Sequence, residues 1–436
     1  MTDAALQSRG TRATNTRVLG VPNSSLAIAA FSTVVEWYDF TLYLYLAPVL
    51  ARVFFPDSSY RITVVLAGFA LAYVMRPLGA LLFGYSGDRF GRRRTMLLSM
   101  QVMAAAMLAT ACLPTSARVG ALGGVLLLLL RCVMAFSVGG EYNGVIAYLF
   151  EGARPERRGL VTAMAAGASE IGGLLAVGVA ALVTVAVDAD ALEVWAWRIP
   201  FFVGALLAGG VWFARRAMAE SPEFLRLQES SRTVTNPFVH SLTQHKAGIV
   251  RAFAISALGS ITYYVGITYV PTFLSTTAPA DDRVALSVSS VAAIAVVLVT
   301  PIVGWAADAF GRRSVLRVLA LCSIVMPAAM FSLMKTSSLL ATLGAAVALA
   351  LLAGGVSAVG AVASAEQFPG VSRLSGLAVG NTSATVLFGG FAPLVAQLVV
   401  DATGWTSSPG LLIAATALCV LPVLWRMPET PSNRAG

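Results

Sequence analysis

Long apolar segments alternate with short polar breaks along almost the whole chain. Most of these segments approach or exceed the about 20 apolar residues that a helix needs to cross a bilayer. The pattern therefore predicts twelve membrane-spanning helices and an all-α integral membrane protein. The predicted spans are 26–50, 62–85, 95–113, 119–149, 160–187, 199–214, 248–274, 284–307, 314–334, 339–365, 374–400 and 411–427.

The main polar interruption separates the first six spans from the last six. It contains Ser221-Pro222-Glu223 and Asn236-Pro237, which are typical of a polar linker. The chain is therefore predicted to form two six-helix bundles, 26–216 and 248–427. A linker, 217–247, joins them, and short tails, 1–25 and 428–436, flank them.

One short motif occurs once in each half, 220 positions apart. Residues 84–93 read GYSGDRFGRR and residues 304–313 read GWAADAFGRR, and each lies between two apolar segments. Transporters built from two similar halves work by rocking one half against the other. The motif residues are candidates for a gate: Gly84, Asp88, Arg89, Gly91, Arg92, Arg93, Gly304, Asp308, Gly311 and Arg312.

Charge is scarce and unevenly placed. Charged residues make up 12% of the chain, against about a quarter in a soluble domain. Of the 30 Lys and Arg residues, most lie on the side that holds both termini. By the positive-inside rule both termini are predicted to be cytoplasmic. The net charge of +9 thus reflects topology in a cell membrane, and nucleic-acid binding is excluded.

A few charged residues lie deep inside predicted spans, where each costs at least ~2.5 kcal/mol unless it is paired or hydrated. All of them belong to the first half: Glu36, Asp39, Arg76, Arg131, Glu141 and Glu170. Such residues are functional candidates. The four cysteines all lie in apolar segments and show no disulfide or metal-ligand spacing, so no metal site is predicted.

Glu36, Asp39 and Tyr43 share one face of the first span because they are three and four residues apart. Two carboxylates at a site of low dielectric repel each other, so at least one is expected to hold a proton near neutral pH. This pattern predicts proton coupling by Asp39 and Glu36. The alternative is that both are ionised and neutralise Arg131 or Arg76.

The deep arginines need partners because guanidinium stays protonated. Arg131 is predicted to switch partners and couple proton to substrate, with a fixed ion pair to the first span as the alternative. Arg76 and Glu141 lie at matching depth and are predicted to form a structural ion pair. Glu170 remains open between a proton site, a gate and a protonated filler.

Several further side chains are candidates for lining a central polar cavity. They are Tyr43, Arg131 and Glu170 in the first half and Tyr263, Tyr264 and Asn381 in the second. Tyrosines also suit a quaternary ammonium group. The segment Gly84-Tyr85-Ser86-Gly87 has the form of an intramembrane serine protease motif, but neither histidine lies in a span to act as its base. An enzyme is therefore not predicted.

Over nearly its whole length the chain resembles the major facilitator superfamily, and more narrowly its metabolite:proton symporter family. The two motif copies carry the first resemblance. The second is carried by segments such as Val34-Val35-Glu36-Trp37-Tyr38-Asp39-Phe40, Arg76-Pro77-Leu78-Gly79, Gly139-Gly140-Glu141 and Glu220-Ser221-Pro222-Glu223-Phe224. Where the family has Arg-x-x-Gln-Gly, this chain has Arg131-Cys132-Val133-Met134-Ala135. Ala309 replaces the arginine of the first copy, which predicts a weaker second gate.

The resemblance implies proton-coupled symport of a small polar metabolite by rocker-switch alternating access. Members carry organic acids such as citrate, 2-oxoglutarate and shikimate, or zwitterions such as proline and betaine. The proton is then the coupling ion, no cofactor is expected, and the protein is expected to be a monomer. A proton-independent facilitator or exchanger, and a membrane sensor that does not transport, remain alternatives.

Overall fold

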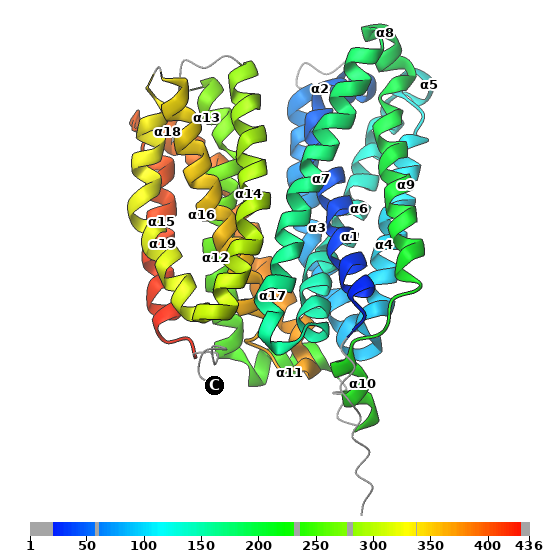
Figure 1. Cartoon of the computed structure of the whole chain (residues 1–436). Coiled ribbons are helices and arrows are strands. Elements are labelled where there is room, and N and C mark those ends of the chain that lie inside the picture. The colour runs from blue at the N-terminus through cyan, green and yellow to red at the C-terminus, as the bar shows by residue number, and fades with distance from the viewer. Residues whose placement is uncertain (1–20, 57–60, 231–235, 277–281, 337, 429–436) are drawn as a thin grey trace, which may run out of the picture.

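The computed structural model describes residues 21–56, 61–230, 236–276, 282–336 and 338–428, and every regular element among them is a helix (Figure 1). The predicted tails therefore lie mostly outside the described residues. Ten helical stretches are long and apolar enough to cross a membrane. Helices α1 (Asn23–Tyr45) and α3 (Arg61–Phe90) occupy the remaining two predicted spans.

The first half runs from α1 to α9. Its other elements are α2 (Ala47–Phe54), α4 (Arg92–Ala111), α5 (Ser116–Val119), α6 (Ala121–Gly152), η1 (Pro155–Arg157), α7 (Arg158–Ala186), α8 (Ala189–Ala191), η2 (Leu192–Ala196) and α9 (Arg198–Arg215). The predicted linker contains two short helices, α10 (Pro222–Glu229) and α11 (Pro237–Gln244). Each begins at a side-chain cap, because Ser221 Oγ accepts from Phe224 N–H and Asn236 Oδ1 from Val239 N–H.

The second half repeats this plan. Its elements are α12 (Lys246–Tyr263), η3 (Tyr264–Thr268), α13 (Val270–Thr276), α14 (Asp282–Phe310), α15 (Arg312–Met334), α16 (Leu339–Ala365), η4 (Gly370–Ser372), α17 (Arg373–Thr385), η5 (Val386–Gly390), α18 (Ala392–Thr403) and α19 (Ser408–Trp425). The segments η3 and η5 are π-helical turns that interrupt two spans near their middle. Interruptions of this kind often occur at functional sites.

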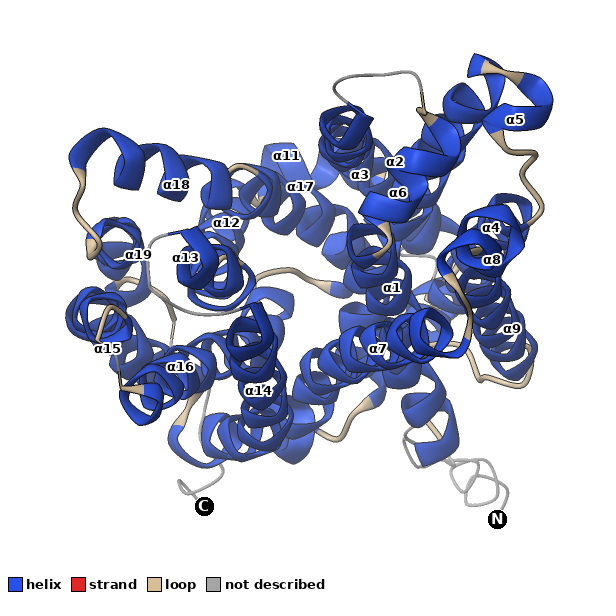
Figure 2. Ribbon diagram, turned by 90° about the horizontal axis from the view of Figure 1, so that it is seen from above, coloured by secondary structure: helices blue, strands red, loops and turns tan. Residues whose placement is uncertain are grey.

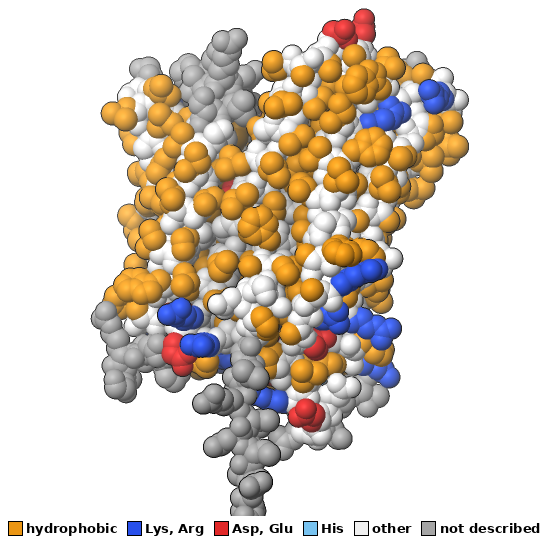
Figure 3. All heavy atoms as spheres, turned by 45° about the vertical axis from the view of Figure 1, so that its right-hand side comes forward, with side chains coloured by type: hydrophobic (Ala, Val, Ile, Leu, Met, Phe, Trp, Pro, Cys, Tyr) orange, Lys and Arg blue, Asp and Glu red, His pale blue; other side chains and the backbone are white. Residues whose placement is uncertain are grey.

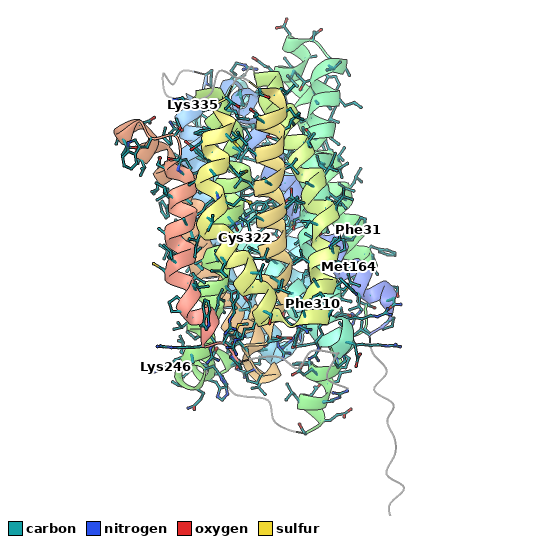
Figure 4. All side chains as sticks on the ribbon, turned by 60° about the vertical axis from the view of Figure 1, so that its left-hand side comes forward. Phe31, Met164, Lys246, Phe310, Cys322 and Lys335 are labelled. Carbon is teal, nitrogen blue, oxygen red and sulfur yellow. The ribbon has the colours of Figure 1, made fainter. Side chains whose placement is uncertain are left out.

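Side chains on the outside of the bundles suit a lipid environment. Figure 3 shows hydrophobic side chains over most of one face, with Lys and Arg gathered toward its lower end. In the second half, Lys246 and Lys335 lie at opposite ends, and the exposed Cys322 lies between them (Figure 4). A helix needs no partner for its backbone groups in lipid, which explains why helices alone fill this region.

Glycines allow two helices of the first half to approach closely. A Cβ on Gly79 of α3 would lie 1.8 Å from the carbonyl oxygen of Phe136, and one on Gly139 of α6 would lie 2.1 Å from that of Arg76. No side chain fits at either position. Small residues at such crossings are typical of helix pairs in membranes.

The two halves lie side by side, and α7 and α14 of opposite halves pack together, as do α3 and α17 (Figure 2). We call the end where α3 ends and α4 begins the motif end, and the opposite end the far end. Helix α1 begins and α19 ends at the motif end, beside α10 and α11 (Figure 1). In each half a glycine makes the motif turn with positive φ, 107° at Gly91 and 89° at Gly311. Glycine adopts this conformation without steric cost.

Candidate functional site

A cavity of about 160 Å³ lies between the two halves near the middle of the bundles. The first half contributes side chains from α1, α3, α6 and α7, and the second from α12, η3, α14, α16 and α17. Of the cavity residues that the sequence suggests, Glu170, Tyr263, Tyr264 and Asn381 line it. Its other polar lining residues are Glu36, Arg76, Tyr142, Asn143, Ser169, Ser256, Ser260, Ser357, Ser364, Thr382 and Thr385.

Glu36 and Arg76 place opposite charges on the first-half wall of this cavity. Glu36 is 3% exposed, and its Oε2 has no hydrogen-bond partner among the described residues. The Arg76 guanidinium lies 4.5 Å from the ring centroid of Tyr73 and 5.2 Å from that of Phe40. Aromatic faces attract a cation, so the rings hold the guanidinium at the cavity.

The predicted ion pair between Arg76 and Glu141 is wrong. Both Glu141 carboxylate oxygens bind Arg215 at the end of α9, and Glu141 Oε2 also accepts from Ser99 Oγ at 2.5 Å. Arg215 in turn donates to Ser32 Oγ and to the carbonyl oxygen of Met96. The prediction rested on the similar depth of Arg76 and Glu141 along their helices. The two side chains point in different directions, however, because Glu141 faces α4 and α9 and Arg76 faces the cavity.

Asp39 and Arg131 form a buried ion pair, with Arg131 Nη1 2.5 Å from Asp39 Oδ2. The Arg131 guanidinium also lies 4.7 Å from the ring centroid of Tyr43, and the Tyr43 hydroxyl donates to the carbonyl oxygen of Val65 at 3.2 Å. Asp39 and Arg131 line two small cavities within the first half, Tyr43 lines one of them, and none of the three lines the central cavity. The prediction that Tyr43 and Arg131 line the central cavity is therefore wrong. Asp39 and Glu36 share the small cavity that reaches Arg76.

Aromatic side chains from both halves cover the far-end side of the central cavity. The hydroxyls of Tyr73 and Tyr264 are hydrogen-bonded at 2.5 Å, and the Tyr263 hydroxyl donates to Glu170 Oε1. The Trp37 ring packs on Tyr263 with 5.3 Å between ring centroids. Because α3 and α12 run in opposite directions, Tyr73 and Tyr264 both lie farther from the motif end than the polar groups of the cavity. The layer joins the halves on that side.

Amide and hydroxyl groups join the halves on the motif-end side of the cavity. Asn143 Nδ2 donates to Thr382 Oγ1 at 3.1 Å, and Asn381 Nδ2 donates to Asn143 Oδ1 at 3.4 Å. The Ser256 hydroxyl donates to the carbonyl oxygen of Asn381 at 3.1 Å. Asn381 Oδ1 is buried and lacks a hydrogen-bond partner among the described residues. This side of the cavity therefore offers both donors and an acceptor to a polar solute.

At the motif end, Asp88 and Asp308 each bind the first turn of a helix in the opposite half. Asp88 accepts from Leu374 N–H at 3.1 Å and Ser375 N–H at 2.7 Å at the start of α17. Asp308 accepts from Gly159 N–H at 2.8 Å and Leu160 N–H at 2.9 Å at the start of α7. Carboxylates are favoured at helix N-termini because the N–H groups there lack partners. The repeated motif thus makes a repeated contact.

Charged neighbours extend the first contact. Arg92 bonds Glu151 at 2.9 Å within its own half and the carbonyl oxygen of Gly370 at 2.7 Å in the other. Arg373 of the second half reaches the same Glu151 at 2.7 Å. Glu220 of the linker accepts from the backbone N–H groups of Arg92 and Arg93 at the start of α4. The motif end is therefore closed by ion pairs as well as helix caps.

The remaining motif arginines differ in their contacts. Arg89 donates to the Tyr85 hydroxyl, and the Arg93 side chain donates to the carbonyl oxygen of Arg216, so neither of these bonds crosses between the halves. In the second copy, Arg312 bonds Asp308 at 2.8 Å and Glu366 at 3.2 Å. Gly84 and Gly304 lie where backbone of the opposite half approaches, at Leu374 and at Gly159 and Leu160. These glycines permit the close approach on which both caps depend.

A family model described as "Sugar (and other) transporter" matches residues 26–236, and one described as "Major Facilitator Superfamily" matches residues 280–436. The chain is 31% identical to an ectoine/proline transporter of Corynebacterium glutamicum, over 90% of this chain and 82% of that protein. It is 30% identical to an alpha-ketoglutarate permease of Escherichia coli, over 90% of this chain and 89% of that protein. The chain belongs to the major facilitator superfamily.

This membership confirms the predicted fold class and the predicted resemblance. Another relative, a citrate-proton symporter of Klebsiella pneumoniae, is 28% identical over 89% of this chain and 87% of its own length. A solved proton:xylose symporter shares the fold with a TM-score of 0.77 at 19% identity, covering 94% of this chain and 96% of that one. By its family the chain is a multi-pass membrane protein and a secondary active transporter, and not an enzyme.

Three residues of the site were not predicted from the sequence. Arg215 stands at a predicted helix end among other basic residues, so nothing distinguished it from a topological charge. Asn143 is a lone amide in a long apolar span, and a polar side chain in such a position is by itself a signal for a cavity residue. Tyr73 lies three residues before Arg76, and this spacing on one helix face is the signal by which their contact could have been predicted.

Proposed function

We propose that this transporter is a proton-coupled symporter for a small solute that carries both a carboxylate and a cationic nitrogen. The observation that carries the proposal is that the wall of the central cavity holds the guanidinium of Arg76 together with the carboxylates of Glu36 and Glu170. A single fixed cation neutralises one carboxylate of a solute and leaves a tricarboxylate under-neutralised. Glu36, which has an oxygen without a partner, complements an amine or quaternary nitrogen.

The aromatic side chains support the same solute class. Trp37, Tyr263 and Tyr264 line the cavity beside Glu36, and aromatic faces attract quaternary nitrogen. Among the relatives are an ectoine/proline transporter and a proline/betaine transporter of Salmonella typhimurium, the latter 28% identical over 93% of this chain and 82% of its own length. Relatives named for citrate and alpha-ketoglutarate represent the competing solute class.

Proton coupling is assigned to Asp39, Glu36 and Arg131. The Asp39–Arg131 pair lies beside the central cavity and shares a small cavity with Glu36 and Arg76. Protonation of Asp39 would release Arg131, and Glu36 is the other carboxylate within that small cavity. Glu170 belongs to the gate in this scheme because its carboxylate accepts from Tyr263 of the opposite half.

The closures on both sides of the cavity support alternating access. The Asp88 and Asp308 caps close the motif end, and the aromatic layer closes the far-end side. We assign the bundles 26–216 and 248–427 as the two moving bodies, with 217–247 as their linker. The motif end is assigned to the cytoplasm because Lys and Arg concentrate on the side of the termini. The protein is assigned to the cell membrane, as a monomer.

The test is substrate-triggered proton movement by the purified protein in liposomes, with proline, betaine, ectoine, citrate, 2-oxoglutarate and shikimate compared. External alkalinisation on addition of a zwitterion, and not of the acids, is the expected result. Alkalinisation with citrate alone would contradict the solute class. Tracer flux of any of these solutes without proton movement would contradict proton coupling and indicate a facilitator or exchanger.

A further inference from the structure

A second, larger cleft lies at the far end of the first half. Its volume is about 1230 Å³, and it is bounded by the ends of α2, α4, α6, η2 and α9 and by the short helix α5. Viewed from above, α5 and α8 lie on the side of the first half that faces away from the second half (Figure 2). None of the residues that line the cleft lines the central cavity. A solute in transit is therefore not its natural occupant.

The cleft concentrates positive charge where the chain has little. Three arginines, Arg52, Arg118 and Arg198, line it together with a single carboxylate, Glu193. On the predicted topology these are three of only six Lys and Arg residues at this end of the molecule. Figure 3 shows blue side chains near the top of the first half, separate from the larger group below.

The contacts of these arginines leave a net positive charge. Arg52 forms an ion pair with Glu193, and the two side chains remain 40% and 41% exposed. Arg198 donates to the carbonyl oxygens of Val194 at 2.8 Å and Leu113 at 2.9 Å, so only neutral groups compensate its charge. Arg118 is exposed and has no ion pair among the described residues. A site with two uncompensated guanidinium groups attracts an anion, and guanidinium suits phosphate geometry.

The walls between these charges are apolar. Phe54, Phe55 and Val125 line the cleft, and Trp195, which is 51% exposed, lies at its edge. Tryptophan is enriched where a membrane meets water, and helix ends are where basic side chains reach lipid headgroups. The cleft therefore has an apolar wall and a basic rim at the end of the membrane-spanning helices. A phospholipid has the same arrangement, because its phosphate lies next to its acyl chains.

We propose that this cleft binds the headgroup of an anionic phospholipid, with Arg118 and Arg198 contacting the phosphate and the apolar wall contacting the upper acyl chain. The site is independent of solute transport, because it lies on the outer side of the first half. Arg52 adds to its positive rim while it holds Glu193 away from the phosphate.

The test is native mass spectrometry of the purified full-length protein with phosphatidylglycerol or phosphatidylcholine. The wild-type protein is expected to bind one phosphatidylglycerol more tightly than phosphatidylcholine. One basic residue near an anionic surface contributes about a five-fold change in affinity. The double variant Arg118→Ala/Arg198→Ala removes both arginines assigned to the phosphate and is therefore expected to lose affinity for phosphatidylglycerol by about 25-fold. Lys335→Ala, a matched change at the same end of the second half, is expected to leave the affinity unchanged.

A second variant separates loss of charge from loss of folding. Val125→Trp fills the cleft without changing its charge, and Val125 is half exposed, so folding tolerates the change. It is expected to weaken binding while solute uptake in liposomes stays at the wild-type rate. Equal wild-type affinity for the two lipids, or unchanged affinity in the double variant, would overturn the proposal. Displacement of the lipid by equimolar inorganic phosphate would also overturn it, since the site would then serve a free anion.

Discussion

Asp88 and Asp308 make the same contact in opposite directions, each capping the first turn of a helix that belongs to the other half. Both carboxylates are almost completely buried, at 5% and 7% exposure. Each also pairs with the arginine four residues later, at 2.8 Å. The motif end is therefore held by two related latches, and neither can form once the halves separate there.

Asp88→Asn is expected to weaken the first latch. An amide keeps one acceptor oxygen but loses the charge that strengthens bonds to two N–H groups, and hydrogen bonds to charged groups contribute about 1.5–3 kcal/mol. A loss of about 2 kcal/mol shifts the ratio of closed to open motif end by about 30-fold. Initial uptake rates in liposomes should fall at least several-fold. Asp401→Asn, at an exposed position, is the control, and undiminished uptake by the Asp88 variant would contradict the latch.

Asp39→Asn tests the proton site. Asparagine carries no charge beside Arg131 at any proton concentration, so solute binding no longer depends on protonation of this pair. Counterflow exchange of labelled solute should persist, and accumulation driven by a proton gradient should be lost. Glu36→Gln is the comparison, because Glu36 shares the small cavity with Asp39. Normal accumulation by the Asp39 variant would transfer the proton to Glu36 or Glu170.

Glu141→Gln should destabilise the first half more than any change at the cavity. Glu141 and Arg215 are fully buried, and removal of one partner of a buried pair leaves an unpaired charge that costs about 3–5 kcal/mol. The melting temperature in detergent should fall strongly. Adding Arg215→Met should restore part of the loss because it removes the unpaired charge. If the double variant melts below both single variants, the pair does not act as a unit.

Two glycines of α7 should respond oppositely to alanine. A Cβ on Gly172 would lie 2.3 Å from the carbonyl oxygen of Val34, so Gly172→Ala must push α7 away from α1. Overpacking of this kind costs about 1–3 kcal/mol. An added Cβ on Gly178 meets no atom of the described residues within 4 Å, so Gly178→Ala should be neutral or stabilise by up to about 1 kcal/mol. Thermal unfolding of both variants checks the contrast, and equal melting temperatures would contradict it.

Hydrophobic periodicity, the placement of charged residues and the repeated motif were sufficient to predict the architecture. Twelve spans and two halves follow from local properties, because a helix in lipid satisfies its own backbone hydrogen bonds and its ends are marked by charge. The cavity residues Glu170, Tyr263, Tyr264 and Asn381 were also found from sequence, since polar groups deep in apolar spans are costly unless they face a polar space.

The sequence did not predict which buried charged residues contact each other, because these contacts depend on the rotation and tilt of each helix. Arg76 and Glu141 match in depth, yet Glu141 turns toward Arg215 on α9 and Arg76 toward the rings of Tyr73 and Phe40. Arg131 was identified as a deep cation, but only the packed bundle shows that it meets Asp39 away from the central cavity. Sequence by itself determined which residues lie in the membrane and at what depth. Tertiary structure alone decided which of them touch, because contact depends on angles between helices that no single helix encodes.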